Sequence, residues 1–117
     1  MRPRRRVEQF NKVTRTSGRG LDVSTYLASF RVNGERKNFN AAVPLPDFVR
    51  LKASNVLGRP VTEDDMKAAI RVKIIDLVPL GLLDFWPPSE TIRVPGIEYR
   101  ELDALFASAM RMGLIEP

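Results

Sequence analysis

Two runs rich in strand-forming residues, 24–32 and 35–43, flank the dipeptide Asn33-Gly34. Asn-Gly is the preferred pair for a two-residue type I′ hairpin turn, because both turn positions need a positive φ angle. The pattern therefore predicts an antiparallel hairpin. A two-residue turn also fixes the register and gives one largely apolar face, on which Tyr26, Ala28 and Phe30 face Ala41, Phe39 and Lys37.

The segment before the hairpin, residues 7–16, carries two conflicting patterns. Val7, Phe10 and Val13 recur at every third position, as on a helix. Residues 13–16 have instead the composition of a strand, and the Ser-Gly-Arg-Gly run at 17–20 is typical of a flexible turn. The segment is therefore either a helix or a third strand beside the hairpin.

Helical patterns follow the hairpin. After the Pro-Leu-Pro run at 44–46, a short helix is predicted from about Asp47 to Gly58, carrying Phe48, Leu51 and Val56. The next helix starts at Thr62, a good N-cap, and ends at Pro79. Its apolar stripe consists of Met66, Ala69, Ile70, Ile74, Leu77 and Val78.

The three acidic residues at 63–65 have two interpretations, helix capping or a divalent-metal cluster. Consecutive helical residues point about 100° apart and do not converge on one ion. Capping, together with a favourable interaction with the helix dipole, therefore explains these residues.

A last helix is predicted over about residues 98–112 and is capped by Gly113. Its inner face holds Tyr99, Leu102, Leu105, Phe106 and Ala109. Between residues 80 and 96 the chain stays apolar without periodicity, and residues 91–94 form a candidate short strand. The cluster Leu82, Leu83, Phe85 and Trp86 in this region is either core or an exposed partner site.

Together these patterns predict an α+β fold: an N-terminal antiparallel β-hairpin or three-stranded meander packed against about three C-terminal helices. A chain of 117 residues fits one domain, here residues 7–117, preceded by a basic, flexible arm at residues 1–6. No apolar region follows that arm, so we expect neither a signal peptide nor a membrane anchor, and a cytoplasmic protein.

The chain contains no His and no Cys, which excludes several kinds of chemistry. It cannot provide a Cys/His zinc site, a histidine-dependent nucleophile, a haem ligand or a disulfide. Catalysis would have to use carboxylates, Lys, Tyr or a hard metal ion. We expect no enzymatic activity, no cofactor and no metal ion.

Positive charge is concentrated near the N-terminus. The whole chain has a net charge of +5, whereas residues 1–37 hold ten basic and three acidic residues, a net of +7. Such segregation attracts polyanions at long range, although the arginine run could also be a solvated tail. The two-residue turn also places Arg31 opposite Arg36, a like-charge pair. The candidate anion-binding residues are Arg2, Arg4, Arg5, Arg6, Arg15, Arg19, Arg31, Arg36 and Lys37.

Three functions are compatible with these features. The first is a non-enzymatic protein that binds nucleic acid or a nucleoprotein complex through phosphate contacts, with little base readout. The second is a protein-interaction module using Leu82, Leu83, Phe85 and Trp86, such as an adaptor, an assembly component, or a small phage- or mobile-element-type inhibitor, with the basic hairpin matching an acidic partner surface.

The third is a Mg²⁺-dependent carboxylate nuclease. The order of Glu8, Asp22, Glu35 and Lys37 resembles the Glu, Asp, Glu-x-Lys series of the restriction-endonuclease-like nucleases and archaeal Holliday-junction resolvases. The resemblance implies carboxylates that hold Mg²⁺ and a lysine beside the attacking water. It covers these few residues only, and Glu35 directly follows the Asn-Gly turn, whereas the family's Glu-x-Lys lies inside a buried strand.

Overall fold

A computed structural model describes residues 4–17, 22–84 and 90–117. Three antiparallel strands open the chain: β1 (Val7–Ser17), β2 (Val23–Val32) and β3 (Phe39–Pro46). The segment with two conflicting patterns is therefore a strand, which completes the three-stranded meander.

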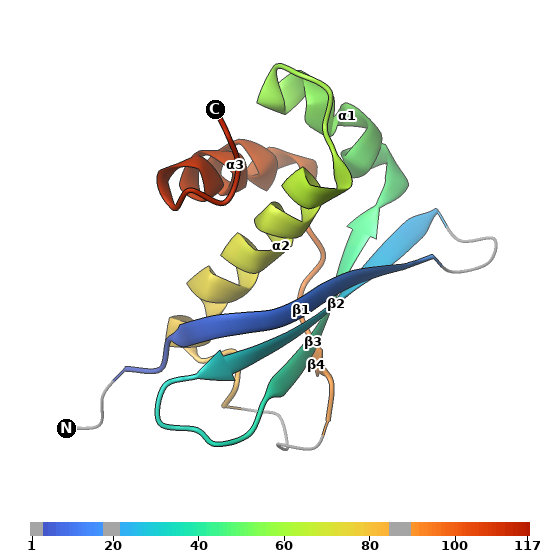
Figure 1. Cartoon of the computed structure of the whole chain (residues 1–117). Coiled ribbons are helices and arrows are strands. Elements are labelled where there is room, and N and C mark those ends of the chain that lie inside the picture. Colours follow the sequence, from blue (N-terminus) through green and yellow to red (C-terminus); the bar gives the residue numbers. More distant parts are fainter. Residues whose placement is uncertain (1–3, 18–21, 85–89) are drawn as a thin grey trace.

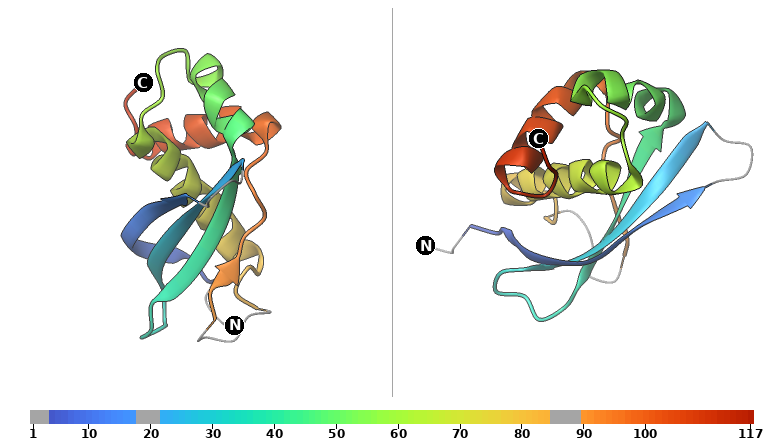
Figure 2. Two further views of the ribbon diagram at one scale, coloured as in Figure 1. Left: turned by 90° about the vertical axis from the view of Figure 1, so that its right-hand side faces the viewer. Right: turned by 45° about the horizontal axis from the view of Figure 1, so that its top comes forward.

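Helices α1 (Asp47–Leu57) and α2 (Glu63–Leu77) follow, and α2 continues into a 3-10 turn, η1 (Val78–Leu80). The short strand β4 (Ile92–Arg93) then pairs parallel with β3, giving the sheet order β1-β2-β3-β4. A second 3-10 turn, η2 (Tyr99–Glu101), leads into α3 (Leu102–Arg111). The helices gather on one side of the sheet (Figure 1; Figure 2). The predicted α+β class is confirmed.

The register of the β2–β3 hairpin differs from the prediction by two residues. Phe30 faces Phe39 rather than Lys37, and Tyr26 faces Val43. A shift of two preserves the alternation, so the same residues still point toward the core. The observed register packs Phe39 against Phe30, with ring centroids 6.1 Å apart, where the predicted one would bury the charged Lys37. The predicted Arg31–Arg36 pair is also wrong, because the β2–β3 pairing ends at Phe30 and Phe39 and Arg36 lies in the loop before β3.

The Asn33-Gly34 turn exists but is not of type I′. The amide of Glu35 donates to the carbonyl of Val32 at 3.2 Å, which closes a four-residue turn. Gly34 has φ +78°, whereas no non-glycine residue in the described ranges has a positive φ, so Asn33 does not adopt the angle that a type I′ turn requires.

The predicted starts and caps of α1 and α2 are confirmed, whereas the last helix starts at Leu102, after η2, rather than at about residue 98. Gly58 caps α1 in the left-handed conformation, and Thr62 and Asp65 form a reciprocal capping box at the start of α2. On α1, however, the core-facing residues are Val49 and Ala53, whereas Phe48 and Leu51 are 58% and 80% exposed. Within the described ranges, no helix has the length and apolarity that crossing a membrane requires.

The core lies between the sheet and the helices. The inward side chains of β2 alternate with outward ones, so that Tyr26, Ala28, Phe30 and Val32 are buried. They meet the apolar stripe of α2 and the inner face of α3, where Leu102, Leu105, Phe106 and Ala109 are buried as expected. Tyr99, also predicted on that inner face, is 41% exposed. The opposite face of the sheet has no helix on it among the described elements (Figure 2).

Candidate functional site

The N-terminal arm is held against the β2–β3 turn by Asn33. The amide of Arg6 donates to Asn33 Oδ1 at 2.7 Å, and Asn33 Nδ2 donates to the carbonyl of Arg4 at 3.1 Å. The amide of Asn33 also donates to the carbonyl of Arg6 at 3.1 Å. Two basic segments far apart in the sequence therefore lie side by side.

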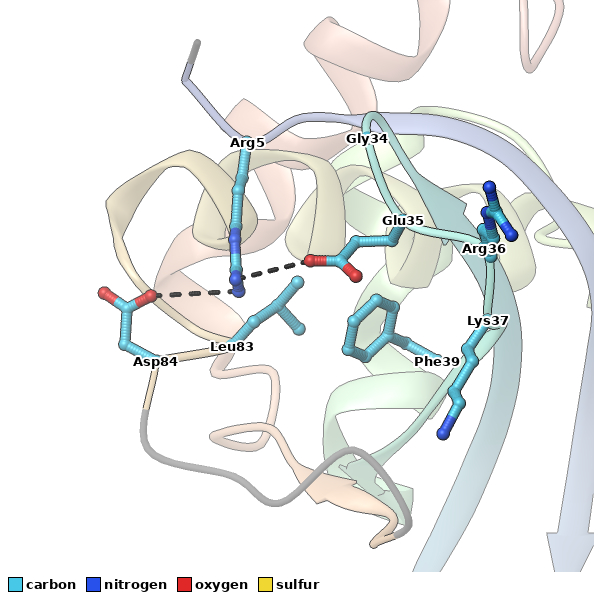
Figure 3. Close-up of a pocket in the computed structure, with 8 residues that line it drawn as sticks. All are labelled: Arg5, Gly34, Glu35, Arg36, Lys37, Phe39, Leu83 and Asp84. Atoms are coloured by element: carbon cyan, nitrogen blue, oxygen red, sulfur yellow. Dashed lines mark hydrogen bonds and ion pairs between the residues drawn. The ribbon is translucent and has the colours of Figure 1, made fainter. Parts of the chain in front are cut away.

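A pocket of about 680 Å³ opens between the arm, the β2–β3 loop and the segment after η1 (Figure 3). Phe39 and the buried Leu83 give it apolar walls. Arg36 and Lys37 extend from the loop on the side opposite Arg5 (Figure 3). The remaining lining residues are Gly34, Glu35 and Asp84.

Inside this pocket the charge of Arg5 is balanced by two carboxylates. Its guanidinium lies 3.4 Å from Glu35 and 3.9 Å from Asp84 (Figure 3). Arg4, Arg6, Arg36 and Lys37 are exposed instead, and no carboxylate in the described part of the chain forms an ion pair with any of them. We call these four residues the basic end. Their charge is available to an external anion.

Arg15, another predicted anion-binding residue, lies at the far end of β1 in a polar cluster. Its guanidinium is 3.6 Å from Glu63 of α2, and its Nε donates to Ser24 Oγ at 3.0 Å. Arg50 of α1 also pairs with Glu63, and Arg50 and Tyr26 are hydrogen-bonded at 2.6 Å. The hydroxyl of Tyr26 donates to Glu63 at 2.6 Å. Arg15 therefore joins β1 to α2, and through Glu63 to α1, rather than to the basic end.

The titration behaviour of this cluster follows from its contacts. Burial alone would raise the pKa of Glu63, but hydrogen bonds from Arg50 and Tyr26 and the charges of Arg50 and Arg15 outweigh burial, so the pKa is lowered. Burial, reinforced by the hydrogen bond to Glu63, raises the pKa of the Tyr26 hydroxyl. The cluster thus holds an ionised Glu63 and a neutral Tyr26 at neutral pH.

Arg31 lies on the face of the sheet that carries no helix among the described elements, which we call the open face. Two further cationic residues, which the sequence did not identify as candidate anion-binding residues, lie on the same face. Arg31 is paired with Gln9, Lys12 with Ser29, and Arg93 of β4 with Ala42 of β3. All three cationic residues are exposed. The alternation along β2 already marked Arg31 as outward. Lys12 and Arg93 could be assigned to this face only from the β1 register and the parallel β3–β4 pairing.

The proposed protein-interface cluster is only partly described. Leu83 is 4% exposed and belongs to the core, and the half-buried Leu82 packs against it. Leu83 therefore follows the core alternative, whereas a protein contact by the cluster stays a prediction. Phe85 and Trp86 lie outside the described residues, as do Arg2 and Arg19 of the anion-binding set.

The four residues of the nuclease resemblance are not brought together. Glu8 lies on β1, Asp22 precedes β2, and Glu35 and Lys37 lie in the loop before β3. Glu35 pairs with Arg5. Within residues 4–17, 22–84 and 90–117, no group of three or more acidic side chains is placed to hold a metal ion. The arrangement that the resemblance implies is therefore not found in the described structure.

Comparison with known proteins finds no matching family model, and neither a curated protein nor a solved structure matches the chain significantly.

Proposed function

We propose that this protein is a non-enzymatic binding protein that attaches to nucleic acid, or to a nucleoprotein complex, through phosphate contacts of the basic end. The observation that supports the proposal is the hydrogen-bonded contact between arm and loop, which gathers Arg4, Arg6, Arg36 and Lys37 on one side of the molecule. Guanidinium groups form paired, charge-assisted hydrogen bonds with phosphate oxygens, which makes phosphate the anion that this set suits.

Affinity should depend steeply on salt, because each neutralised phosphate releases condensed counterions. The slope of log K against log salt is about −0.9 per contact on duplex DNA and about −0.7 on a single strand. Fluorescence anisotropy with labelled single- and double-stranded oligonucleotides at several salt concentrations measures this slope. An affinity that does not fall as salt is raised contradicts the proposal.

A matched pair of variants separates the basic end from net charge. Arg36→Ala with Lys37→Ala should reduce the magnitude of the single-strand slope by about 1.4. Arg100→Ala with Arg111→Ala removes the same charge from exposed residues of η2 and α3 and should leave the slope unchanged. Equal losses in both variants would mean that only the overall charge attracts nucleic acid. Circular dichroism and thermal midpoints confirm that each variant folds.

A different observation favours a second candidate function, a protein-interaction module. Phe48, Leu51 and Lys52 have the spacing of one exposed helix face on α1, and the Lys52 ammonium lies 5.8 Å from the ring centroid of the exposed Tyr99. A cation surrounded by apolar side chains suits a protein surface that presents a carboxylate among apolar groups.

Retention of partners from a native lysate, with and without nuclease treatment, distinguishes the two functions. Binding that disappears with nuclease supports the nucleic-acid proposal. Binding that survives nuclease but is lost on Leu51→Ser supports the protein-interaction module. Leu51 is 80% exposed, so this substitution should leave the core intact.

A further inference from the structure

The open face of the sheet is a second surface of positive charge. The register identifies the strand positions on this face. Paired residues share a face, and successive residues along one strand point to opposite faces. From β1 to β4 the outward residues of the paired positions are Gln9, Lys12, Thr14, Thr16, Val23, Thr25, Leu27, Ser29, Arg31, Asn40, Ala42, Pro44, Pro46 and Arg93.

These outward strand positions hold cations and hydrogen-bonding groups but no acidic residue. Lys12, Arg31 and Arg93 come from three different strands, and no carboxylate in the described ranges forms an ion pair with them. Glu90, two residues before β4, lines a hollow with Arg93 at the margin of the face. The exposed Glu8 lies in the β1 bulge between Val7 and Gln9, outside the paired positions. Antiparallel sheets often leave one face in water, but paired positions with three cations and no carboxylate are complementary to an anionic ligand.

A shallow cavity of about 260 Å³ lies in the middle of this face. Lys12 and Ser29 are paired across β1 and β2, and Ser29 is paired with Asn40 of β3. These three residues and Thr91, which precedes β4, contribute an ammonium, two hydroxyls and an amide to its lining. Neighbouring strands are about 4.8 Å apart, so the four strands form a row of donors roughly 14 Å long.

We propose that this open face is a contact surface for the sugar–phosphate backbone of a single-stranded nucleic acid. The inference rests on the proposed function and specifies its ligand. Arg31 is the outward residue next to the end of β2, directly before the loop that carries Arg36 and Lys37. The face is therefore continuous with the basic end, and one strand can follow both.

The composition of the face favours backbone contacts over base recognition. Sheet surfaces that read single strands usually present aromatic rings on which bases stack. Among the outward strand positions named above there is no aromatic residue. The large apolar side chain of Leu27 is exposed there, at 41%, but it has no ring on which a base could stack. Phosphate contacts carry no sequence information, so affinity should be nearly independent of base identity.

A single strand fits this surface better than a duplex or a second copy of the protein. A flexible strand can bring successive phosphates to side chains on a twisted sheet, whereas a rigid duplex cannot follow the curved row. Stacking two copies face to face would bring Lys12, Arg31 and Arg93 against the same charges of the partner. Too few apolar side chains lie there to form the core between two stacked sheets.

The test uses anisotropy with labelled oligo-dT, oligo-dA, an abasic strand of equal length, and a duplex. The variant Lys12→Ala with Arg93→Ala should weaken single-strand binding roughly 10- to 30-fold at 0.1 M salt and reduce the magnitude of the salt slope by about 1.4. Duplex binding should change by less than about threefold. The wild-type protein should bind the three single strands within about threefold of one another. The charge-conserving variant Lys12→Arg with Arg93→Lys should keep the wild-type slope.

The outcomes separate this inference from the proposed function. If Lys12→Ala with Arg93→Ala keeps the wild-type slope while Arg36→Ala with Lys37→Ala loses it, the open face is not a contact and only the basic end binds. If the wild-type protein shows no salt-dependent binding, both fail. A strong preference for one base over the abasic strand overturns the backbone assignment. A concentration-dependent dimer disrupted by Leu27→Ser would assign the face to self-association instead.

Discussion

Replacing Glu63 by Gln tests whether the polar cluster at the start of α2 stabilises the fold. Gln keeps the shape of the side chain and can still accept the hydrogen bond from Tyr26. It removes the negative charge that faces Arg50 and Arg15. Glu63 joins three other elements, so the loss of its charge weakens contacts among β1, β2 and α1 together.

The expected loss lies between the values for surface and buried ion pairs. The side chains of Arg50 and Glu63 are 25% and 34% exposed. Breaking a buried pair costs about 3–5 kcal/mol and an exposed one about 0.2–1 kcal/mol, whereas hydrogen bonds to charged groups contribute about 1.5–3 kcal/mol. We therefore expect Glu63→Gln to reduce the free energy of unfolding by about 2 kcal/mol. For a chain of this length, that lowers the thermal midpoint by about 8 °C.

Asp64→Asn is the matched control. Asp64 also lies in the first turn of α2, but it is exposed and has no ion-pair partner among the described residues. It contributes only through the helix dipole, about 0.3–1 kcal/mol. Urea unfolding of both variants at pH 7, followed by circular dichroism, should show a larger midpoint shift for Glu63→Gln at unchanged slope. Equal shifts in the two variants would refute the role of the cluster.

The pH dependence gives a second check with a definite sign. The folded-state pKa of Glu63 is lowered, so its contribution is fully present above the unfolded pKa of about 4.3 and is lost as the pH falls through the folded value. The difference in stability between the wild-type protein and Glu63→Gln should therefore shrink below about pH 4. A difference that stays constant on acidification would mean that ionised Glu63 is not its source.

Two further predictions concern single side chains. Asp76 is exposed, but partial desolvation of its carboxyl raises its pKa against the opposing charge of Arg111, so the carboxylate weakly destabilises the fold above the folded pKa and not below the unfolded one. Asp76→Asn should thus raise the thermal midpoint at pH 7 and have no effect below about pH 3, which scanning calorimetry at both pH values checks. Asn33→Ala removes both side-chain hydrogen bonds to the arm. Hydrogen exchange at the Arg6 amide should become faster, and oligonucleotide affinity should fall roughly twofold to fivefold, because the arm is no longer pre-organised; unchanged exchange would show that Asn33 does not hold it.

Features governed by neighbouring residues could be predicted from the sequence. The capping of α2 by Thr62 needs only the residues of its first turn, and Gly58 ends α1 because glycine readily adopts the left-handed conformation. The alternation along β2 identified its inward face correctly. It could not fix the register, since a shift of two residues leaves that alternation unchanged.

The tertiary structure alone decided which charges are balanced and which remain available. The number of arginines is known from the sequence, but their ion-pair partners are not. Arg5 pairs with Glu35 and Asp84, and Arg15 pairs with Glu63, all of which lie far along the chain. The arm and loop are joined by the hydrogen bonds of Asn33 to Arg4 and Arg6 and by the Arg5–Glu35 ion pair. Composition fixed the sign and amount of charge, whereas long-range packing determined its position, because ion pairing depends on distances that chain order does not specify.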